Sequence, residues 1–298
     1  MNMTDGEFRK YSFWIFVAIV ILLVAIPATM WLQQDSVHEV RLAPNEPDEL
    51  VATVSAAEEP EPEVIDEPEP RREGLVRYVV VNDSCGPHYE GECLRVRSGP
   101  GEDYPVVSQL REGIVLKVND LVKGEDRDWY HIEFDEWLRY PERLSGEWYI
   151  AAEFVEEVYL DPPVNLSSTT PTSSKRVVVD RSDQKLYAYD DEELFMEADV
   201  STGLEFTPTP RGIFTIFRKT PSRYMQGPLP YLPVSKYYDL PGVPWNLYFT
   251  EQGAVIHGAY WHDSFGSQYS SGCVNLPPEK AKLLYEWADI GSEVWVRD

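Results

Sequence analysis

The sequence predicts a mainly β protein with two folded domains, a helix near the C-terminus and an N-terminal transmembrane helix. From residue 75 onward, short runs of alternating apolar and polar residues are separated by turn-forming residues, a pattern typical of β-strands. Residues 13–32 form an uncharged apolar run, and an acidic, proline-rich stretch separates it from the strand-forming region. A length of 298 residues leaves room for two domains of ordinary size besides these segments.

Residues 1–12 are predicted to be a cytoplasmic tail and residues 13–32 a membrane anchor. A helix of this length spans about 30 Å, the thickness of a hydrocarbon core. Arg9 and Lys10 precede the run and acidic sequence follows it, which favours an orientation with the rest of the chain outside the cytoplasm. A cleaved signal peptide is the alternative, but the run is long for one and residues 25–28 match a cleavage site poorly. We therefore expect a single-pass protein of the cell membrane.

Residues 33–74 are dominated by proline, glutamate and aspartate. Prolines lack a backbone donor and like charges repel, so this stretch is predicted to be an extended linker without a core. The formal net charge of the whole chain is -25. Such acidity argues against a nucleic-acid partner, because binding to phosphates requires clustered lysine and arginine.

Residues 75–158 are predicted to form a small all-β barrel, and residues 159–174 a second linker rich in proline, serine and threonine. The strand candidates of the barrel share an alternation of apolar and polar side chains and are residues 76–81, 114–118, 129–134 and 147–150.

Residues 175–298 are predicted to form the second domain. Its first two strand candidates, residues 176–180 and 186–189, are joined by a polar turn. A helix is expected to begin near Pro277, because proline and an acidic residue favour the first helical turn. Residues 293–296 are the last strand candidate.

A histidine and a cysteine near the C-terminus are the candidate catalytic residues. His257 ends an apolar run, and Cys273 follows sixteen residues later. A thiol with the ordinary pKa of about 8.5 is mostly protonated at neutral pH, so a nucleophilic cysteine needs a base such as an imidazole. Gly258 and Gly272 permit close backbone approach beside the two residues, and a turn at Gly272 can aim amides at an oxyanion.

His257-Gly258, followed by residues 270–275 (Ser-Ser-Gly-Cys-Val-Asn), resembles the signature of the YkuD-type L,D-transpeptidases, which cross-link bacterial peptidoglycan. The resemblance implies that Cys273 is the acylated nucleophile and His257 its general base, oriented by the carbonyl of Gly258. It further implies an oxyanion hole at the amides of Gly272 and Cys273, and a place for Asn275 beside the substrate.

Residues 199–203 (Asp-Val-Ser-Thr-Gly) and 209–214 (Thr-Pro-Arg-Gly-Ile-Phe) extend the resemblance over most of the second domain and imply a YkuD-like β-sandwich. One position departs from the family, because Ser271 stands where a histidine usually precedes the Gly-Cys pair. We expect Ser271 and Trp261 to help shape the walls of the site. The resemblance implies peptidoglycan stem peptides as partners, activity on the cell-wall side of the membrane, and no metal or cofactor.

Residues 94–101, 104–107 and 111–113 resemble the bacterial SH3-like domain, a module often attached to cell-wall enzymes. Its closing element corresponds to residues 146–150, and the insertion at residues 135–145 is longer than a minimal domain needs. The resemblance implies binding of wall peptides. A role that only spaces or braces the second domain is equally compatible with the sequence.

Cys85 and Cys93 lie eight residues apart in the predicted outward-facing domain, where a disulfide can persist. Pairing them leaves Cys273 as the odd thiol, which suits a nucleophile. Two unpaired structural cysteines are the alternative.

The sequence predicts an L,D-transpeptidase that releases D-alanine from a tetrapeptide stem through a cysteine acyl-enzyme. Water as the acceptor would make the same site an L,D-carboxypeptidase. A non-catalytic wall-binding protein is the alternative from another class, and a zinc hydrolase that uses His257, His262 and Cys273 is a third.

Overall fold

The structure is a computed structural model that describes residues 74–82, 84–85, 93–125, 127–144, 146–163, 173–228 and 237–298. The expected tail at residues 1–12, the membrane anchor at residues 13–32 and nearly all of the acidic linker lie outside these ranges. Within them, no helix has both the length and the apolar character needed to cross a membrane. The chain divides into two compact units, Met1–Ile65 and Asp66–Asp298, and every described residue belongs to the second.

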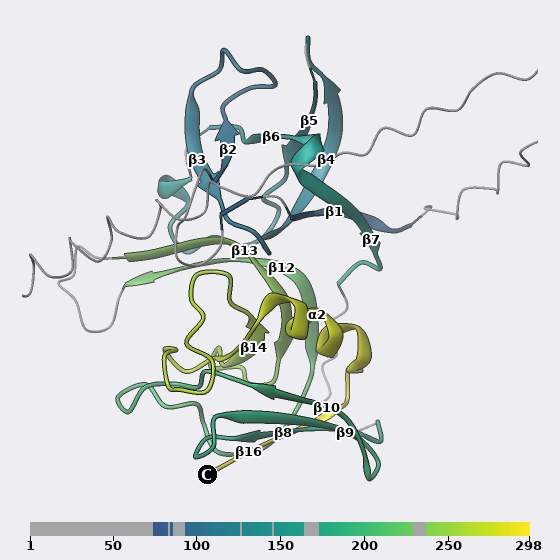
Figure 1. Ribbon diagram of the computed structural model, residues 1–298, viewed down its shortest axis with the longest axis vertical. Helices are drawn as coiled ribbons and strands as arrows, with labels where there is room; N and C mark the ends of the chain where they lie inside the picture. The colour runs from purple at the N-terminus through teal and green to yellow at the C-terminus, as the bar shows by residue number, and fades with distance from the viewer. Residues whose placement is uncertain are drawn as a thin grey trace, which may run out of the picture. The chain divides into compact units, whose positions relative to one another are not determined.

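Seven strands of the N-terminal part form one antiparallel sheet in the order β3-β2-β6-β5-β4-β1-β7 (Figure 1). The alternation of apolar and polar residues explains them, since one face of each central strand is buried. The strands are β1 (Val76–Val81), β2 (Leu94–Arg97), β3 (Val106–Leu110), β4 (Val115–Lys123), β5 (Asp128–Ile132), β6 (Tyr149–Ala151) and β7 (Val155–Leu160), with short 3₁₀ helices η1 (Pro141–Arg143) and η2 (Ala152–Phe154). The predicted all-β character of this part is confirmed, and its SH3-like identity stays a prediction.

The C-terminal part contains two further sheets that face each other (Figure 1). One has the order β10-β9-β8-β16-β11, and the other has the order β12-β13-β14-β15. Their strands are β8 (Lys175–Asp180), β9 (Lys185–Asp190), β10 (Glu193–Asp199), β11 (Gly212–Thr215), β12 (Arg218–Pro228), β13 (Tyr237–Tyr248), β14 (Val255–Gly258), β15 (Val274–Leu276) and β16 (Glu293–Arg297). The arrangement confirms a mainly β fold and is consistent with the expected β-sandwich.

Among the described residues there is one α-helix, α2 (Pro278–Trp287), which packs against β13 and β14. It begins as expected, with proline at the start and Glu279 in the first turn. Ala281 and Leu284 are buried in a core that also contains Val177 of β8 and Leu247 of β13. The helix therefore contributes side chains to the core that the two sheets share.

The N-terminal sheet packs directly on strands β12 and β13. Ser222 Oγ of β12 donates a hydrogen bond of 2.6 Å to the carbonyl oxygen of Val115 in β4. Gly242 of β13 has a φ of +62°, and a Cβ there would lie 2.6 Å from the same carbonyl oxygen, so only glycine fits. Val243 and Tyr260 are buried in the core of the N-terminal sheet. Each part therefore contributes buried residues to the core of the other, since Tyr78 and Val115 are in turn buried in the core of the C-terminal sheets.

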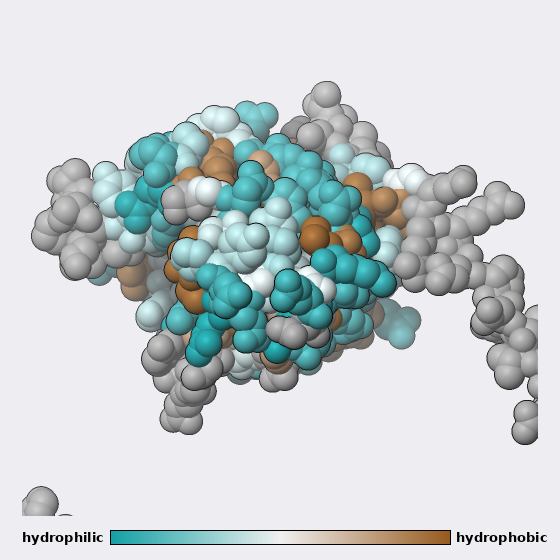
Figure 2. Space-filling model, turned by 90° about the horizontal axis from the view of Figure 1, so that it is seen from above, coloured by the Kyte–Doolittle hydropathy of each residue, from teal (hydrophilic) through white to brown (hydrophobic). Residues whose placement is uncertain are grey.

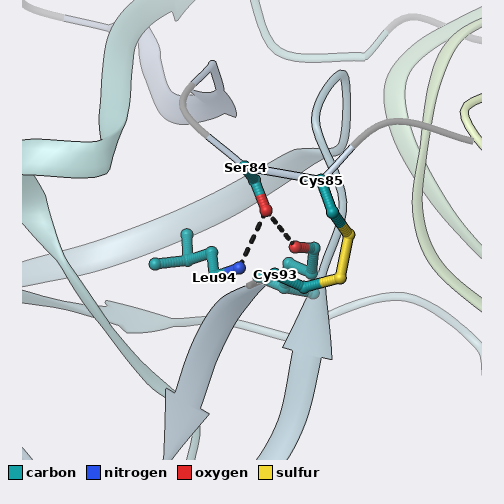
Figure 3. The surroundings of a disulfide bond; sticks show 5 residues. Ser84, Cys85, Cys93 and Leu94 are labelled. Atoms are coloured by element: carbon teal, nitrogen blue, oxygen red, sulfur yellow. Dashed lines mark hydrogen bonds between the residues drawn. A yellow bond between two sulfur atoms is a disulfide. The ribbon is translucent and has the colours of Figure 1, made fainter. Parts of the chain in front are cut away.

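A disulfide joins Cys85 to Cys93 beside strand β2 (Figure 3). Ser84 Oγ bridges the same region, since it donates to the carbonyl oxygen of Leu110 at 2.7 Å and accepts from the Leu94 amide at 2.8 Å. The disulfide and this bridge tie the segment before β2 to the end of β3.

The face of the molecule drawn in Figure 2 is mostly hydrophilic, and its hydrophobic residues form small patches separated by polar side chains. Monomeric proteins commonly show such scattered apolar surface, which by itself indicates no docking site.

Candidate active site

Strands β14 and β15 bring the predicted histidine and cysteine together. The two strands are parallel, and His257 lies opposite Asn275 in their register. Cys273 lies in the bend immediately before β15. All three line one cavity of about 560 Å³.

His257 is held as a neutral imidazole. It is only 1% exposed, and its Nδ1 lies 2.9 Å from the carbonyl oxygen of Gly258. A carbonyl accepts, so Nδ1 carries the proton and Nε2 is left as the basic nitrogen. Burial lowers the pKa of His257 to about 4, although the Gly258 carbonyl opposes this shift. The ring of Trp261 packs against it, with ring centroids 5.7 Å apart.

Gly258 is required by packing. A Cβ at this position would lie 2.8 Å from Cγ of Pro244 and 3.1 Å from Cα of Pro278. Any larger residue would displace the backbone whose carbonyl orients His257. The sequence expectation that this carbonyl orients the imidazole agrees with the contact.

Cys273 is a free, partly exposed cysteine in this cavity. Its Sγ lies 3.8 Å from the carbonyl oxygen of Gly253, to which the thiol donates. Burial raises the pKa of the Cys273 thiol, while a hydrogen bond from the Val255 amide and the positive charge of Arg223 oppose the rise. The resting residue is therefore a thiol at neutral pH, and attack requires removal of its proton.

The turn before Cys273 depends on a glycine and on Ser270. Gly272 has a φ of +118°, which residues with a side chain rarely adopt, although a Cβ there would make only an ordinary contact, 3.6 Å from the Thr207 carbonyl oxygen. Ser270 Oγ accepts from the Gly272 amide at 3.1 Å and donates to the Cys273 carbonyl at 2.5 Å. The Gly272 amide is thus already engaged in this state. Ser271 is exposed and lines the cavity.

A segment after β10 braces strand β15. Ser201 and Asn275 exchange backbone hydrogen bonds of 3.0 and 2.9 Å. The Gly203 amide donates to Thr209 Oγ1 at 2.9 Å, and this hydroxyl lies 3.4 Å from the Cys273 carbonyl oxygen. The two motifs that extended the YkuD resemblance, residues 199–203 and 209–214, therefore support the turn that contains Cys273. The sequence indicated that these motifs matter, but their contacts with the turn could not be predicted from it.

Asn275 is buried, and its side-chain amide lies 2.9 Å from Nε2 of His262. Nδ1 of His262 accepts from the Ser264 amide at 3.1 Å, and burial lowers the pKa of His262 to about 4. A neutral imidazole whose Nδ1 accepts must carry its proton on Nε2, so the Asn275 amide oxygen is the matching acceptor. The other Asn275 amide atom is buried and has no hydrogen-bond partner among the described residues. His262 thus orients Asn275, a contact that the sequence did not reveal.

The far wall of the cavity comes partly from the N-terminal sheet. Trp137 and Arg139 lie in the loop between β5 and β6, and they line the cavity together with Arg223 of β12 and Tyr238 of β13. Trp137, Arg139 and Arg223 were not singled out from the sequence as part of the site. The long insertion at residues 135–145 was a signal, but not of its position.

Within the described residues, no three side chains of His, Cys, Asp or Glu lie close enough together to bind one metal ion. Nδ1 of His257 and both nitrogens of His262 are engaged in the hydrogen bonds above.

A comparison with known protein families matches the part of the chain that carries the site. The family model of the YkuD L,D-transpeptidase catalytic domain matches residues 174–296, which include His257 and Cys273. The YkuD resemblance is thereby confirmed for this part of the chain, and the comparisons do not bear on the SH3-like resemblance. No curated protein matches the chain.

Solved L,D-transpeptidases resemble the structure at low overall scores. One from Mycobacterium smegmatis is 21% identical, with 57% of this chain and 91% of that chain covered and a TM-score of 0.40. The catalytic domain of the Enterococcus faecium enzyme is 27% identical, with coverage of 42% and 98% and a TM-score of 0.37. One from Mycobacterium tuberculosis H37Rv is 22% identical, with coverage of 50% and 64% and a TM-score of 0.37.

Proposed function

We propose that this protein is an L,D-transpeptidase that cross-links peptidoglycan stem peptides through an acyl-enzyme on Cys273. The observation that carries the proposal is the hydrogen bond between His257 Nδ1 and the Gly258 carbonyl, because it leaves Nε2 as a base in the cavity that Cys273 lines. The family match over residues 174–296 supports the same reaction.

In the proposed reaction, the Cys273 sulfur attacks the carbonyl carbon of the third residue of a tetrapeptide stem. His257 Nε2 accepts the thiol proton and then gives it to the leaving amine, so D-alanine departs and a thioester remains. An amine of a second stem attacks the thioester, loses a proton to His257 and forms the new amide, and the thiol is restored. The thiol proton thus leaves with D-alanine, and the acceptor amine supplies the proton that restores the thiol, so the steps balance without a cofactor.

The oxyanion formed in each step needs hydrogen-bond donors. The Gly272 amide already donates to Ser270 Oγ, so the Cys273 amide is the better candidate in this conformation. Asn275 lines the same cavity, and its contact with His262 fixes the orientation of its side-chain amide.

We further propose that residues 13–32 anchor the protein in the cell membrane, with the catalytic part on the cell-wall side. The apolar run with its basic flank supports this, and the disulfide between Cys85 and Cys93 suits an oxidising compartment. Membrane fractionation and protease protection of whole cells test this localisation. Recovery of the full-length chain in the soluble fraction would contradict it.

Intact-protein mass spectrometry of the full-length chain with a carbapenem tests the nucleophile. Carbapenems acylate the enzymes that the sequence resembles, so we expect one adduct per chain, lost in Cys273→Ala and strongly slowed in His257→Gln. A folded wild-type protein that forms no adduct and resists alkylation at Cys273 would refute the proposal. The wall-binding alternative would then have to explain the cavity. Product analysis with one stem peptide as donor and acceptor separates transpeptidation from release to water.

A further inference from the structure

The cavity around Cys273 has a positive wall in a strongly acidic protein. Two arginines, Arg139 and Arg223, line it, and no aspartate or glutamate appears among its described lining residues. The formal net charge of the chain is -25. Positive charge in a cavity is unexpected in so acidic a protein, because its many carboxylates favour a negative potential. The two arginines therefore indicate a role at this site.

Neither arginine is neutralised by an ion pair with a described residue. The Arg139 guanidinium lies over the ring of Tyr140 at 5.6 Å, and that of Arg223 lies over the ring of Tyr248 at 5.5 Å. Stacking on an aromatic face leaves the in-plane N–H donors of a guanidinium free. Both groups are therefore able to make the two parallel hydrogen bonds that a carboxylate accepts.

The acidic groups near the two arginines already have other partners. Glu136 Oε1 accepts from the Tyr224 amide at 2.7 Å, and burial raises the pKa of Glu136 to about 7. Its charge is therefore incomplete at neutral pH. Asp239 pairs with Arg143 at 2.7 Å and accepts from Gln226 at 3.1 Å. Neither carboxyl group competes fully for the cavity arginines.

The loop that carries Arg139 is fastened to the catalytic strands. The Tyr140 amide donates to Gln226 Oε1 at 3.0 Å, and Gln226 Nε2 returns a bond of 3.3 Å to the Tyr140 carbonyl. The bonds from Tyr224 to Glu136 and from Arg143 to Asp239 secure the same loop on either side. Arg139 is thus presented by a braced segment, and the long β5–β6 insertion gains a role that a minimal barrel would not need.

Tyr238 connects the two arginines with the nucleophile. Burial raises the pKa of Tyr238, Cys273 adds to the rise, and the positive charges of Arg223 and Arg139 oppose it. Both arginines and the cysteine therefore act on one hydroxyl, which places them around a common part of the cavity.

We propose that Arg139 and Arg223 form an anion subsite that binds a carboxylate of the donor stem peptide, so that the N-terminal sheet helps to select the substrate. This subsite rests on the proposed function. The carboxylate has two possible sources in a stem, the C-terminal D-alanine and a side-chain carboxylate on the third residue. In either case Trp137, which is 81% exposed at the cavity wall, offers apolar surface to the rest of the peptide.

Donor kinetics on the full-length protein test the subsite with three tetrapeptides: one with both carboxylates free, one amidated at the C-terminus and one amidated on the third side chain. We expect Arg139→Gln to raise KM for the free peptide about tenfold, the loss typical of one charge-assisted hydrogen-bond partner. Amidation of the bound carboxylate should weaken the wild type similarly and abolish the difference between wild type and variant. Arg139→Lys should restore part of the affinity, and the exposed Arg211→Gln, outside the cavity, is the matched control.

The two arginines need separate readouts, because Arg223 also acts on the thiol. Arg223→Gln should raise KM and also slow alkylation of Cys273 by iodoacetamide, whereas Arg139→Gln should leave alkylation unchanged. Equal losses on free and amidated donors, or an effect of Arg211→Gln as large as that of Arg139→Gln, would overturn the subsite.

A binding measurement separates this inference from the proposed function. Calorimetric titration of Cys273→Ala with the same peptides requires no turnover. We expect the free peptide to bind about tenfold more tightly than the amidated one, and Arg139→Gln to remove that preference. Binding without the charge preference overturns the subsite alone. A charge-selective protein that never forms an acyl-enzyme would retain the subsite and refute the transpeptidase.

Discussion

The pH dependence of acylation follows from the burial of His257. Burial lowers the pKa of His257 to about 4, so at pH 5 about 90% of this imidazole is still the neutral base, whereas a histidine of ordinary pKa, about 6.5, would be only about 3% neutral. The structure therefore predicts an acylation rate at pH 5 about thirtyfold higher than a solvated base would allow, relative to the rate at pH 8.

The assay is the second-order rate of carbapenem adduct formation between pH 4 and pH 8, followed by intact mass. This rate reports the ionisation of the free enzyme, and the profile should fall on the acid side with a midpoint near 4. His257→Gln keeps a donor for the Gly258 carbonyl but has no basic nitrogen, so its rate should be about 10²–10⁴-fold lower at neutral pH. An acid limb near pH 6.5 would refute the reasoning, as would a His257→Gln rate equal to that of the wild type.

Glu136, Gly272 and His262 provide three further tests. The folded protein holds the Glu136 proton up to a pKa of about 7, so the stability of the wild type falls as pH rises from about 4.3 to 7. Glu136→Gln should therefore raise the free energy of unfolding by up to about 3 kcal/mol at pH 8.5 and hardly change it at pH 4.5. A difference between variant and wild type that does not depend on pH in urea melts would contradict this. Gly272→Ala should cost about 1–3 kcal/mol of stability and slow Cys273 alkylation, because a φ of +118° strains alanine. The control Gly146→Ala, at a φ of +69° in an open turn, should lower stability but leave alkylation unchanged. Thermal melts measure the stability of both variants, and alkylation rates measure the reactivity of Cys273. His262→Ala should lower the acylation rate about tenfold, because it removes the contact that orients Asn275. In a double-mutant cycle, this effect should largely vanish when Asn275→Ala is already present. Additive losses would show that the contact has no catalytic role.

Local patterns in the sequence predicted some of the strands, among them β1, β8 and β16, and pointed to a candidate base and nucleophile. Strand β1 runs from Val76 to Val81 as expected, because its alternating residues bury one face. The helix after Pro277 follows from its own residues, which supply both the start signal and the buried stripe. His257 and Cys273 were recognisable because both belong to one short sequence motif. In the fold, this motif spans the parallel strands β14 and β15.

The rest of the site depends on contacts between distant segments. Arg139 lines the cavity only because residues around Tyr140 bond to Gln226, a partner 86 positions away. The orientation of Asn275 depends on His262, whose two nitrogens have roles set by the surrounding loop. Neither arrangement leaves a periodic or compositional signal, because each follows from tertiary packing rather than from local preference.

Trapping the acyl-enzyme with its proposed substrate tests the central claim most directly. The full-length protein is mixed with a tetrapeptide stem, quenched in acid and analysed by intact-protein and peptide mass spectrometry. We predict a mass increase equal to the peptide minus D-alanine, located on Cys273, absent from Cys273→Ala and discharged when an acceptor amine is added. A folded protein that binds the peptide but never gains this mass, even when His257 is intact, would contradict the account.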